Sequence, residues 1–204
     1  MGEGLFITLE GIDGVGKTTQ ARLLVEYFIN KSFAVVHTFE PGGTALGRSI
    51  RRMLLDPENQ QLAPATEILL YAADRAQHVA EVIRPALAEG KVVVCERYID
   101  SSVAYQGYGL GLAIDKILAV NKLATGGLEP DVTICLDAEP QSALARVGGD
   151  RIEKRTLAYY ERVRAGFLDI AAQNPQRVIV VSAEGSEEEV AQRVKSSIVR
   201  RLAR

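Results

Sequence analysis

The chain has 204 residues, 47% of them hydrophobic and 25% charged, and its formal net charge at pH 7 is −2. This length suits one domain with a full hydrophobic core. A nearly neutral chain has no general attraction for nucleic acid or anionic lipid, so we expect small-molecule ligands and neither a nucleic-acid nor a membrane partner. The apolar runs fall short of the roughly 20 residues that span a bilayer, and we find no signal segment at the N-terminus.

The two cysteines, Cys95 and Cys135, both lie within apolar runs. This placement favours buried, reduced core thiols over a disulfide or a metal site. Together with the lack of a signal segment, it predicts a cytoplasmic protein.

The first two predicted elements lie in residues 5–20, which read LFITLEGIDGVGKTTQ. Leu5–Leu9 is an apolar, β-prone run, and a helical pattern extends from residue 17 to about residue 31. Between them stands G-x-x-x-x-G-K-T, the phosphate-binding P-loop motif, in the strand–loop–helix context that it requires. The alternative is a glycine-rich turn with a chance lysine. Motif and context agree, so the sequence predicts a nucleoside triphosphate site.

The residue types of this loop suit a polyphosphate. Its glycines let successive backbone N–H groups surround an anion at the positive end of the following helix. Lys17 can reach the β- and γ-phosphates, and the Thr18 hydroxyl can bind Mg²⁺. Asp13 must point away from ATP, because a carboxylate about 4 Å from a phosphate charge costs on the order of 4 kcal/mol at a dielectric near 20. The predicted nucleotide-binding residues are Gly11, Ile12, Asp13, Gly14, Val15, Gly16, Lys17, Thr18 and Thr19.

Further strands and helices alternate along the chain. Apolar runs predict strands at Ala34–Phe39, Val92–Cys95, Val132–Leu136 and Val178–Val181, and periodic patterns predict helices at about 44–55, 64–89, 113–125, 140–147, 153–173 and 186–203. Continuous apolar runs are typical of parallel strands covered on both faces, so the pattern favours a doubly wound α/β sheet. Ligands of such sheets bind at the carboxyl ends of the strands. Those ends carry Glu10-Gly11, Glu40-Pro41-Gly42-Gly43-Thr44, Glu96-Arg97-Tyr98 and Asp137.

The helix after the second strand contains Arg48, Arg51 and Arg52. Arg48 shares a helix face with Arg51 or Arg52, so at least one arginine can point toward the cleft at the carboxyl ends of the strands. The alternative is a solvated basic stripe.

The long third helix contains Tyr71 and Arg75, which are neighbours on one face. An aromatic ring beside a guanidinium can stack on a planar base and hydrogen-bond its edge. The alternative is a core tyrosine and an arginine paired with Glu67 or Asp74.

Residues 96–112, ERYIDSSVAYQGYGLGL, form a connector that is unusually rich in polar and aromatic side chains. Arg97 is suited to a phosphate because it follows a strand end. Ser102, Tyr105 and Gln106 can supply hydrogen bonds and one wall of a ligand site. The alternative is a polar surface loop.

Residues 144–155 combine Arg146, Arg151 and Arg155 with glycines at 148 and 149, which is typical of a mobile flap that closes over phosphates. An ordinary helix break has the same pattern. The loop after the last strand, residues 182–185, includes Ala183 and could hold an adenine ring.

In this order, EGIDGVGKTTQ, EPGGT, the Tyr71/Arg75 pair, ERYIDSSVAYQGYG and DRIE closely resemble the bacterial thymidylate kinases over nearly the whole chain. The resemblance implies one P-loop kinase domain over residues 1–204, with a flap at about 144–155. It implies a three-layer P-loop NTPase fold with a mostly parallel five-stranded sheet and helices on both faces. The implied reaction transfers the γ-phosphoryl group of ATP to dTMP, giving dTDP. The implied cofactor is Mg²⁺, and the implied assembly is a homodimer.

The resemblance also implies roles for single residues. On the donor side, Lys17 and Thr18 serve the ATP phosphates and Mg²⁺, Glu96 stands where an acid organises the metal, and Arg146 or Arg151 stabilises the transferring group. On the acceptor side, Asp13 binds the sugar 3′-hydroxyl, Tyr105 selects deoxyribose, and Arg51 and Arg97 hold the 5′-phosphate. Tyr71 stacks on thymine and Arg75 reads its O4. Ser102 and Gln106 complete the contacts with the base. Glu40, Pro41 and Ser101 complete the implied acceptor site.

Four positions depart from the usual pattern of this family. Phe39 and Leu110 stand where arginines are usual, Glu96 replaces an aspartate, and Tyr71 replaces a phenylalanine. The two missing arginines and the longer acid predict weakened activity or altered phosphate handling, not another reaction, whereas the tyrosine is a milder change.

Two other functions remain open at this point. One is a kinase for another nucleoside or nucleoside monophosphate. The other is a GTPase-like switch, because Asn121-Lys122-Leu123-Ala124 superficially resembles a guanine-reading N-K-x-D motif. Ala124 stands in place of the acid of that motif, and no D-x-x-G segment follows the P-loop.

Overall fold

Five parallel strands form the centre of the computed structural model, which describes residues 4–146 and 148–203. Their order across the sheet is β2-β3-β1-β4-β5, so the strand that leads into the P-loop is central. All the described strand pairs are parallel, and each strand lies within a residue or two of its predicted bounds. The strands are β1 Leu5–Glu10, β2 Val35–Phe39, β3 Val92–Glu96, β4 Val132–Asp137 and β5 Val178–Ser182.

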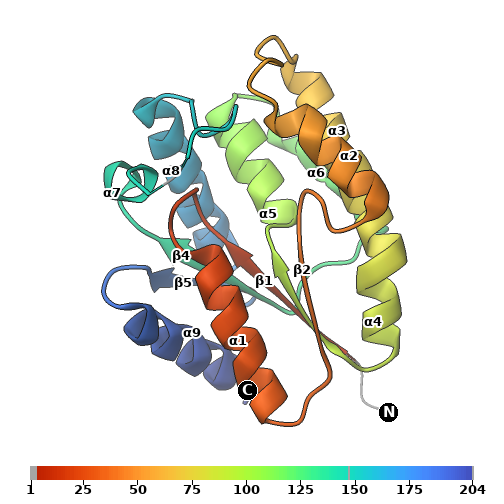
Figure 1. Ribbon diagram of the computed structural model, residues 1–204, viewed down its shortest axis with the longest axis vertical. Helices are drawn as coiled ribbons and strands as arrows, with labels where there is room; N and C mark the ends of the chain where they lie inside the picture. The colour runs from red at the N-terminus through yellow and green to blue at the C-terminus, as the bar shows by residue number, and fades with distance from the viewer. Residues whose placement is uncertain (1–3, 147, 204) are drawn as a thin grey trace.

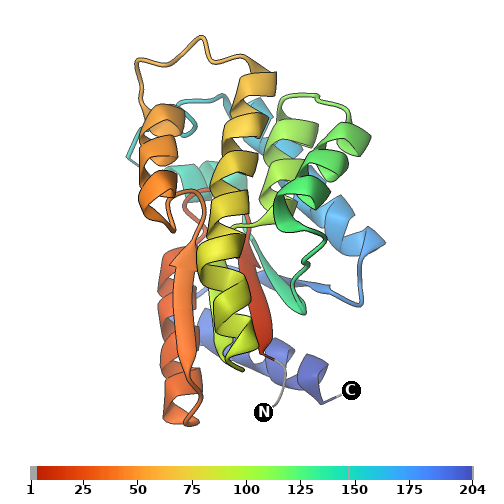
Figure 2. The ribbon, with the colours of Figure 1, turned by 90° about the vertical axis from the view of Figure 1, so that its right-hand side faces the viewer.

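Helices cover both faces of this sheet (Figures 1 and 2). On one face, α1 (Lys17–Asn30) and α9 (Glu187–Leu202) pack side by side against the strands. On the other, α4 (Arg84–Ala88) packs on β3 and α8 (Leu157–Gln173) on β4 and β5. Outside them lie α2 (Ala45–Leu55), α3 (Pro64–His78) and α6 (Ile114–Thr125), with α3 between the other two (Figure 2). The predicted three-layer α/β architecture is confirmed.

The predicted helix over residues 64–89 is one helical path in three parts. A π-helical segment, η1 (Val79–Ile83), joins α3 to α4. Pro85 is the second residue of α4 and has no N–H to donate to the carbonyl four residues earlier. The wider hydrogen-bonding of the π segment accommodates this missing donor.

The prediction of a connector after β3 is wrong, and so is the alternative of a polar surface loop. Residues 99–109 are helical, as α5 (Ile99–Ser102) followed by the π-helical η2 (Val103–Gly109), and most of their side chains are buried. Two glycines allow this packing. A Cβ at Gly109 would come within 2.5 Å of the Tyr159 ring, and one at Gly166 within 2.6 Å of the Tyr108 ring, so η2 and α8 approach closely.

Two other predicted helices are shorter than expected. The helix predicted at 153–173 begins at Leu157, where the Thr156 hydroxyl accepts a hydrogen bond from the Tyr159 N–H and caps it. The helix predicted at 140–147 is α7, Pro140–Leu144, and its predicted last residue lies outside the described residues.

Cys95 and Cys135 are buried, unpaired thiols, as predicted. Within residues 4–146 and 148–203, no helix combines the length and the hydropathy that crossing a membrane requires.

Candidate active site

Two adjoining pockets lie at the carboxyl edge of the sheet. We call the first the P-loop pocket, and its lining includes Gly14, Lys17, Thr18, Glu96 and Arg146. We call the second the helix pocket, and its lining includes Tyr71, Arg75, Tyr105 and Gln106. Asp13, Glu40, Arg51 and Arg97 line both.

The P-loop has the backbone conformation that its glycines predict. Gly14 and Gly16 have φ angles of 79° and 90°, which L-amino acids with side chains rarely adopt. A Cβ at Gly14 would also overlap the Ala143 carbonyl of α7. Gly16 is the N-cap of α1, so the free N–H groups at the start of this helix point into the pocket region.

Lys17 is held inside the loop. Its Nζ donates to the carbonyl oxygens of Gly11, at 3.1 Å, and Ile12, at 2.7 Å. Burial and the neighbouring Arg97 lower the pKa of Lys17 to about 7. A bound anion would favour the charged form, so the binding of phosphate would raise the protonated fraction of Lys17.

Thr18, Glu96 and His37 form a hydrogen-bonded group beside the loop. The Thr18 hydroxyl donates to Oε2 of Glu96 at 2.6 Å, and Nε2 of His37 lies 3.0 Å from Oε1 of the same carboxylate. Burial alone would raise the pKa of Glu96, but the hydrogen bonds from His37 and Thr18 keep it below its ordinary value. The carboxylate is therefore ionised at neutral pH.

The Thr18 and Glu96 oxygens fit a magnesium ion that arrives with its phosphates. Hydroxyl and carboxylate oxygens are hard ligands of the kind that Mg²⁺ prefers. Among the described residues no cluster of three or more His, Cys, Asp or Glu side chains could hold a metal by itself. This is expected for Mg²⁺, which keeps several waters and takes its other ligands from the substrate phosphates.

Arg97 stands at the junction of the two pockets in a strained backbone conformation, with a φ of 65°. Its Nη1 donates to the Gly11 carbonyl at 3.1 Å, and its Nη2 pairs with the Asp13 carboxylate. Asp13 also accepts hydrogen bonds from the hydroxyls of Tyr105, at 2.9 Å, and Tyr160, at 3.1 Å. Burial alone would raise the pKa of Asp13, but the charges of Arg97 and Lys17 lower it to about 2.

Glu10 was predicted to lie at the strand end that faces the ligand, but no role was predicted for it. It is fully buried and accepts hydrogen bonds from the Tyr98 N–H, at 2.7 Å, and the Ser101 hydroxyl, at 2.5 Å. Burial and the nearby Asp100 carboxylate raise its pKa to about 7. Its contacts hold Tyr98 and Ser101, which follow Arg97 in the chain, so Glu10 supports the segment that carries that arginine.

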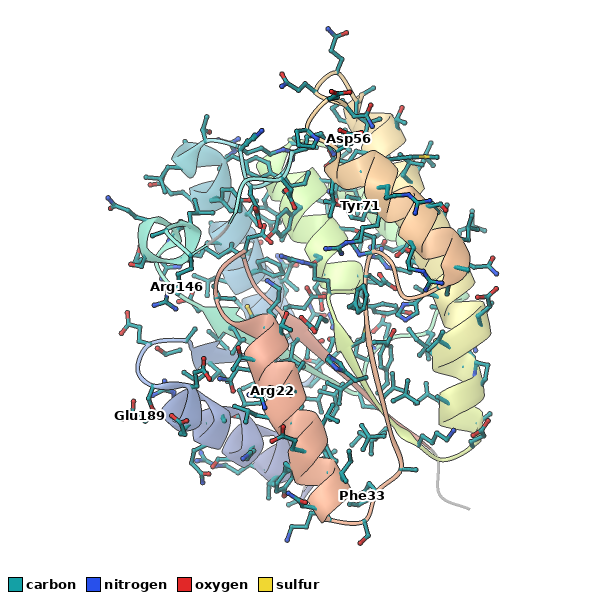
Figure 3. All side chains as sticks on the ribbon, in the orientation of Figure 1. Arg22, Phe33, Asp56, Tyr71, Arg146 and Glu189 are labelled. Carbon is teal, nitrogen blue, oxygen red and sulfur yellow. The ribbon has the colours of Figure 1, made fainter. Side chains whose placement is uncertain are left out.

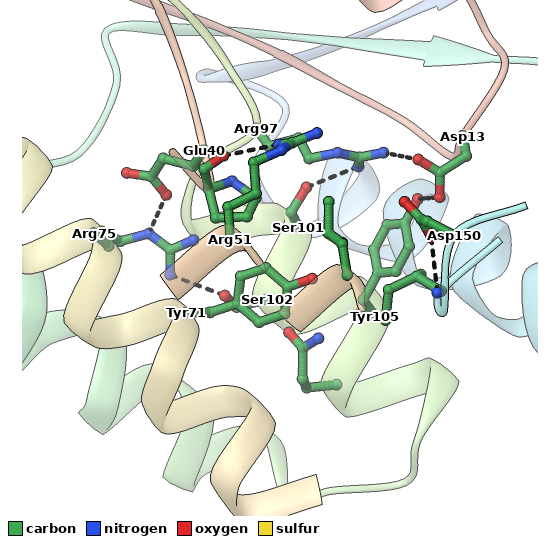
Figure 4. A pocket seen from close by; sticks show the side chains of 14 residues that line it. Asp13, Glu40, Arg51, Tyr71, Arg75, Arg97, Ser101, Ser102, Tyr105 and Asp150 are labelled. Carbon is green, nitrogen blue, oxygen red and sulfur yellow. Dashed lines mark hydrogen bonds and ion pairs between the residues drawn. The ribbon is translucent and has the colours of Figure 1, made fainter. Parts of the chain in front are cut away.

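The Arg75 guanidinium is almost fully bonded to the protein. Nε donates to Glu40 at 2.8 Å, and the two Nη1 hydrogens go to Ser102 and Asn121. Nη2 donates to the Tyr98 carbonyl at 2.8 Å, which leaves one Nη2 hydrogen without a partner among the described residues. The predicted alternative pairing with Glu67 or Asp74 is wrong. Figure 4 shows Arg75 and Glu40 at one end of the helix pocket, Asp13 and Asp150 at the other, and Tyr71 lying between.

The contacts of Asn121 also exclude a guanine-reading motif. It lies buried in α6, where it holds Arg75 and the Ile99 carbonyl, and it lines neither pocket.

The buried Glu67 carboxylate joins the predicted flap to the helix pocket. It accepts hydrogen bonds from Arg151, at 2.7 Å, Arg155, at 2.6 Å, and the Gln106 amide, at 3.0 Å. Glu67 itself was not predicted as a site residue. Because an ionised carboxylate only accepts hydrogen bonds, the NH₂ group of Gln106 must face it, which leaves the amide oxygen as the group that can bind a ligand.

The structure separates the two predicted flap arginines. Arg146, just after α7, lines the P-loop pocket. In Figure 3 it lies across the site from Tyr71, which lines the helix pocket. Arg151 is buried against the Leu54 carbonyl and Glu67 and lines neither pocket.

Other predicted residues also lie outside the pockets. Ala183 is buried and donates its N–H to the Asp137 carbonyl. Arg48 and Arg52 are exposed, as the solvated-stripe alternative predicts, whereas Arg51 lies over the pockets and donates to the Pro41 carbonyl at 2.8 Å.

The family model for thymidylate kinase matches residues 9–194 of the chain. The chain belongs to the thymidylate kinase family. It is 53% identical over 199 residues to the thymidylate kinase of Synechococcus sp. (strain JA-2-3B'a(2-13)), covering 97% of this chain and 96% of that one. It is 49% identical over 203 residues to the thymidylate kinase of Symbiobacterium thermophilum, covering 98% and 95%. A crystal structure of the thymidylate kinase from Ehrlichia chaffeensis superposes with a TM-score of 0.81 at 36% identity, covering 97% of this chain and all of that one.

Three departures from the usual thymidylate kinase pattern can now be placed. Phe39 is partly exposed at the rim of the P-loop pocket, where the Arg51 guanidinium lies 5.8 Å from its ring centre. Leu110 packs against the hydrophobic core, so an arginine is replaced by an apolar contact. The longer acid at 96 reaches both Thr18 and His37.

Proposed function

We propose that this chain transfers the γ-phosphoryl group of ATP to dTMP, giving dTDP, with the P-loop pocket as donor site and the helix pocket as acceptor site. Membership of the thymidylate kinase family supports this reaction. The observation that carries the assignment of the sites is the continuity of the two pockets through Asp13, Glu40, Arg51 and Arg97. A donor phosphate on the P-loop and an acceptor phosphate at the mouth of the helix pocket would meet beside Arg97.

On the donor side, the P-loop amides and Lys17 bind the ATP phosphates, and Thr18 and Glu96 serve Mg²⁺. When bound, the metal neutralises charge on the β- and γ-phosphates. Lys17 then exchanges its carbonyl partners, Gly11 and Ile12, for phosphate oxygens. The carbonyls hold the ammonium group next to its target, so little reorganisation is needed.

On the acceptor side, thymine lies on Tyr71 and is read by two fixed polar groups. The one Nη2 hydrogen of Arg75 that has no partner among the described residues donates to O4. The Gln106 oxygen accepts from N3–H, because Glu67 holds the other end of that amide. Cytosine carries an acceptor at N3 and donors at position 4, so both contacts would be lost with dCMP.

The sugar and phosphate of dTMP complete the acceptor side. Asp13 binds the 3′-hydroxyl, and Tyr105, which donates to Asp13, occupies the space that a 2′-hydroxyl would need. Arg51 and Arg97 hold the 5′-phosphate. Glu40, Pro41, Ser101 and Ser102 complete the lining.

Transfer is in line and needs no covalent intermediate. Bringing one phosphate charge to about 4 Å from another costs on the order of 4 kcal/mol at an effective dielectric near 20. The cationic groups of Lys17 and Arg97 offset this repulsion, and positioning supplies much of the remaining acceleration. Arg146 stabilises the transferring group, because it lines the donor pocket while Arg151 secures the flap segment to Glu67.

The assembly we propose is a homodimer formed through the layer of α2, α3 and α6 (Figure 2). Large apolar side chains project from this layer, with Leu46, Met53, Leu69 and Leu118 each more than half exposed. A second copy would remove them from water. The buried, unpaired thiols Cys95 and Cys135 fit a reducing compartment, so we propose the cytoplasm.

An acceptor panel tests the reaction. With ATP and Mg²⁺ in a coupled assay, we expect dTMP to be phosphorylated well above dUMP, dCMP, AMP and thymidine. If thymidine or AMP is the best acceptor, the substrate assignment is wrong.

A further inference from the structure

His37 lies beside the P-loop pocket and hydrogen-bonds Glu96, the acid of the proposed metal site. It lies on β2, and its Nε2 is 3.0 Å from Oε1 of Glu96, at the end of β3. Thr18, on α1, donates to Oε2 of the same carboxylate at 2.6 Å. Two elements, α1 and β2, therefore hold the carboxylate at the end of β3, with one partner on each oxygen.

The strand register explains why this contact forms. Phe39 is paired with Glu96, and His37 is paired with Val94, so His37 lies two residues back along β2 on the face that carries Glu96. Glutamate at position 96 is one methylene longer than the aspartate usual in this family, and the added length brings its carboxylate to the imidazole. Phe39 supplies no hydrogen bond where the family usually has an arginine.

The contact is oriented. An ionised carboxylate only accepts hydrogen bonds, so the His37 imidazole donates its Nε2–H to Glu96. Among the described residues, His37 makes no other side-chain hydrogen bond, and a third of its side chain is exposed. It can therefore be replaced with little effect on folding.

We propose that His37 is a positioning residue for the metal site, holding the longer Glu96 side chain so that its carboxylate stays against Thr18 beside the ATP phosphates. This inference rests on the proposed function, because it takes Thr18 and Glu96 as the metal site. Without the imidazole, the Glu96 carboxylate keeps only the hydrogen bond from Thr18. One hydrogen bond does not fix the three side-chain torsions of a glutamate, so the side chain can turn away from Thr18.

The test compares His37→Leu, which keeps the bulk and removes the donor, with His37→Gln, whose amide can donate from a similar position. For His37→Leu we expect the Mg²⁺ concentration for half-maximal activity to rise about five- to tenfold, with the KM for dTMP unchanged. In a titration followed by electron paramagnetic resonance, Mn²⁺ should bind the protein–ADP complex more weakly by a similar factor. ADP affinity in EDTA should not change. His37→Gln should keep most of the wild-type Mg²⁺ requirement and Mn²⁺ affinity.

A second arm uses Glu96→Asp, whose shorter side chain cannot reach the imidazole. Adding His37→Leu to Glu96→Asp should change neither the metal requirement nor Mn²⁺ binding further. The proposal is overturned if His37→Leu behaves as wild type in the Mn²⁺ titration, or if its effect is undiminished in the Glu96→Asp background. If wild type fails to phosphorylate dTMP, the proposed function fails, while the Mn²⁺–ADP titrations still decide the role of His37.

Discussion

At the scale of single residues, four cationic side chains of the site already hydrogen-bond to protein oxygens. Lys17 bonds to loop carbonyls, Arg97 to Asp13, Arg51 to the Pro41 carbonyl and Arg75 to Glu40. Such contacts fix each side chain near its proposed target, so the geometry needed for phosphoryl transfer is largely formed in the protein alone.

Lys17→Ala should abolish turnover and leave dTMP binding measurable. The substitution removes the charge that serves the donor phosphates, whereas the helix pocket is lined by other residues. The coupled assay measures turnover, and isothermal titration calorimetry measures dTMP binding. Near-normal turnover would contradict the role given to the P-loop.

The lowered pKa of Lys17 predicts a pH dependence of ATP binding. This pKa is about 7 in the protein, and a bound polyphosphate raises it towards its ordinary value. Below pH 7 the lysine is charged before and after binding, so its contribution to affinity is constant. Above pH 7 the protein must take up a proton on binding, so affinity falls by up to about tenfold per pH unit.

Calorimetry at pH 8 in two buffers of different ionisation enthalpy measures this proton uptake. Lys17→Ala is the matched control, because it keeps the titration of the nucleotide itself. Equal uptake by the two proteins would show that the proton does not go to Lys17.

The residues that could be predicted from sequence are those whose partner is a ligand or the adjacent backbone. Lys17 and Thr18 follow from a local motif, and Asp13 follows from electrostatic repulsion within that motif. The roles of Glu10 and Glu67 could not be predicted in this way, because their partners lie 39 or more residues away along the chain. His37 was missed for the same reason, since its role depends on strand register.

At the scale of elements, the strands were predictable and the π-helical segments were not. A parallel strand covered on both faces has a continuous apolar run, as in β3 and β4. The helical segment 99–109 is rich in polar residues and glycine, so its sequence is typical of a loop. Its polar groups are satisfied by distant partners such as Glu10 and Glu67, which only the folded chain brings together.

The close contact between the P-loop and α7 makes a prediction for this element. Gly14→Ala should strongly weaken ATP binding, because the added methyl group overlaps the Ala143 carbonyl and the φ of 79° is strained for alanine. Gly148→Ala, in the flap, is the matched control, since a Cβ there meets nothing within 4 Å. Calorimetric ATP affinities that are equal for the two variants would contradict this account.

At the scale of the whole molecule, a series of motifs predicts the architecture better than any one of them. The P-loop alone indicates only a nucleotide site. EPGGT, ERY and DRIE, in this order after it, also indicate a second pocket at the carboxyl edge of the sheet. The same series predicted the family and the five-stranded fold. The exposed apolar side chains of the layer of α2, α3 and α6 form no comparable motif.

Leu69→Glu should shift the proposed homodimer towards monomer. Leu69 lies on α3, between α2 and α6, and is 58% exposed, so a charge there would be buried in the dimer. Ile29→Glu is the matched control, because Ile29 is 56% exposed on α1, on the opposite face of the sheet. Sedimentation velocity distinguishes the two variants. A wild-type chain that sediments as a monomer would contradict the dimer itself.

The hydrogen bonds of the site cations to protein oxygens also predict that small anions bind the site weakly. Free sulfate or inorganic phosphate reaching Lys17 or Arg97 meets a cation that already bonds to a carbonyl or a carboxylate, so the free energy it gains there is small. A nucleotide meets the same cations but also stacks its base and engages its sugar. Only a molecule that fills a whole pocket therefore gains substantial binding free energy, so we expect the two pockets to stay available to substrates in the presence of many small anions.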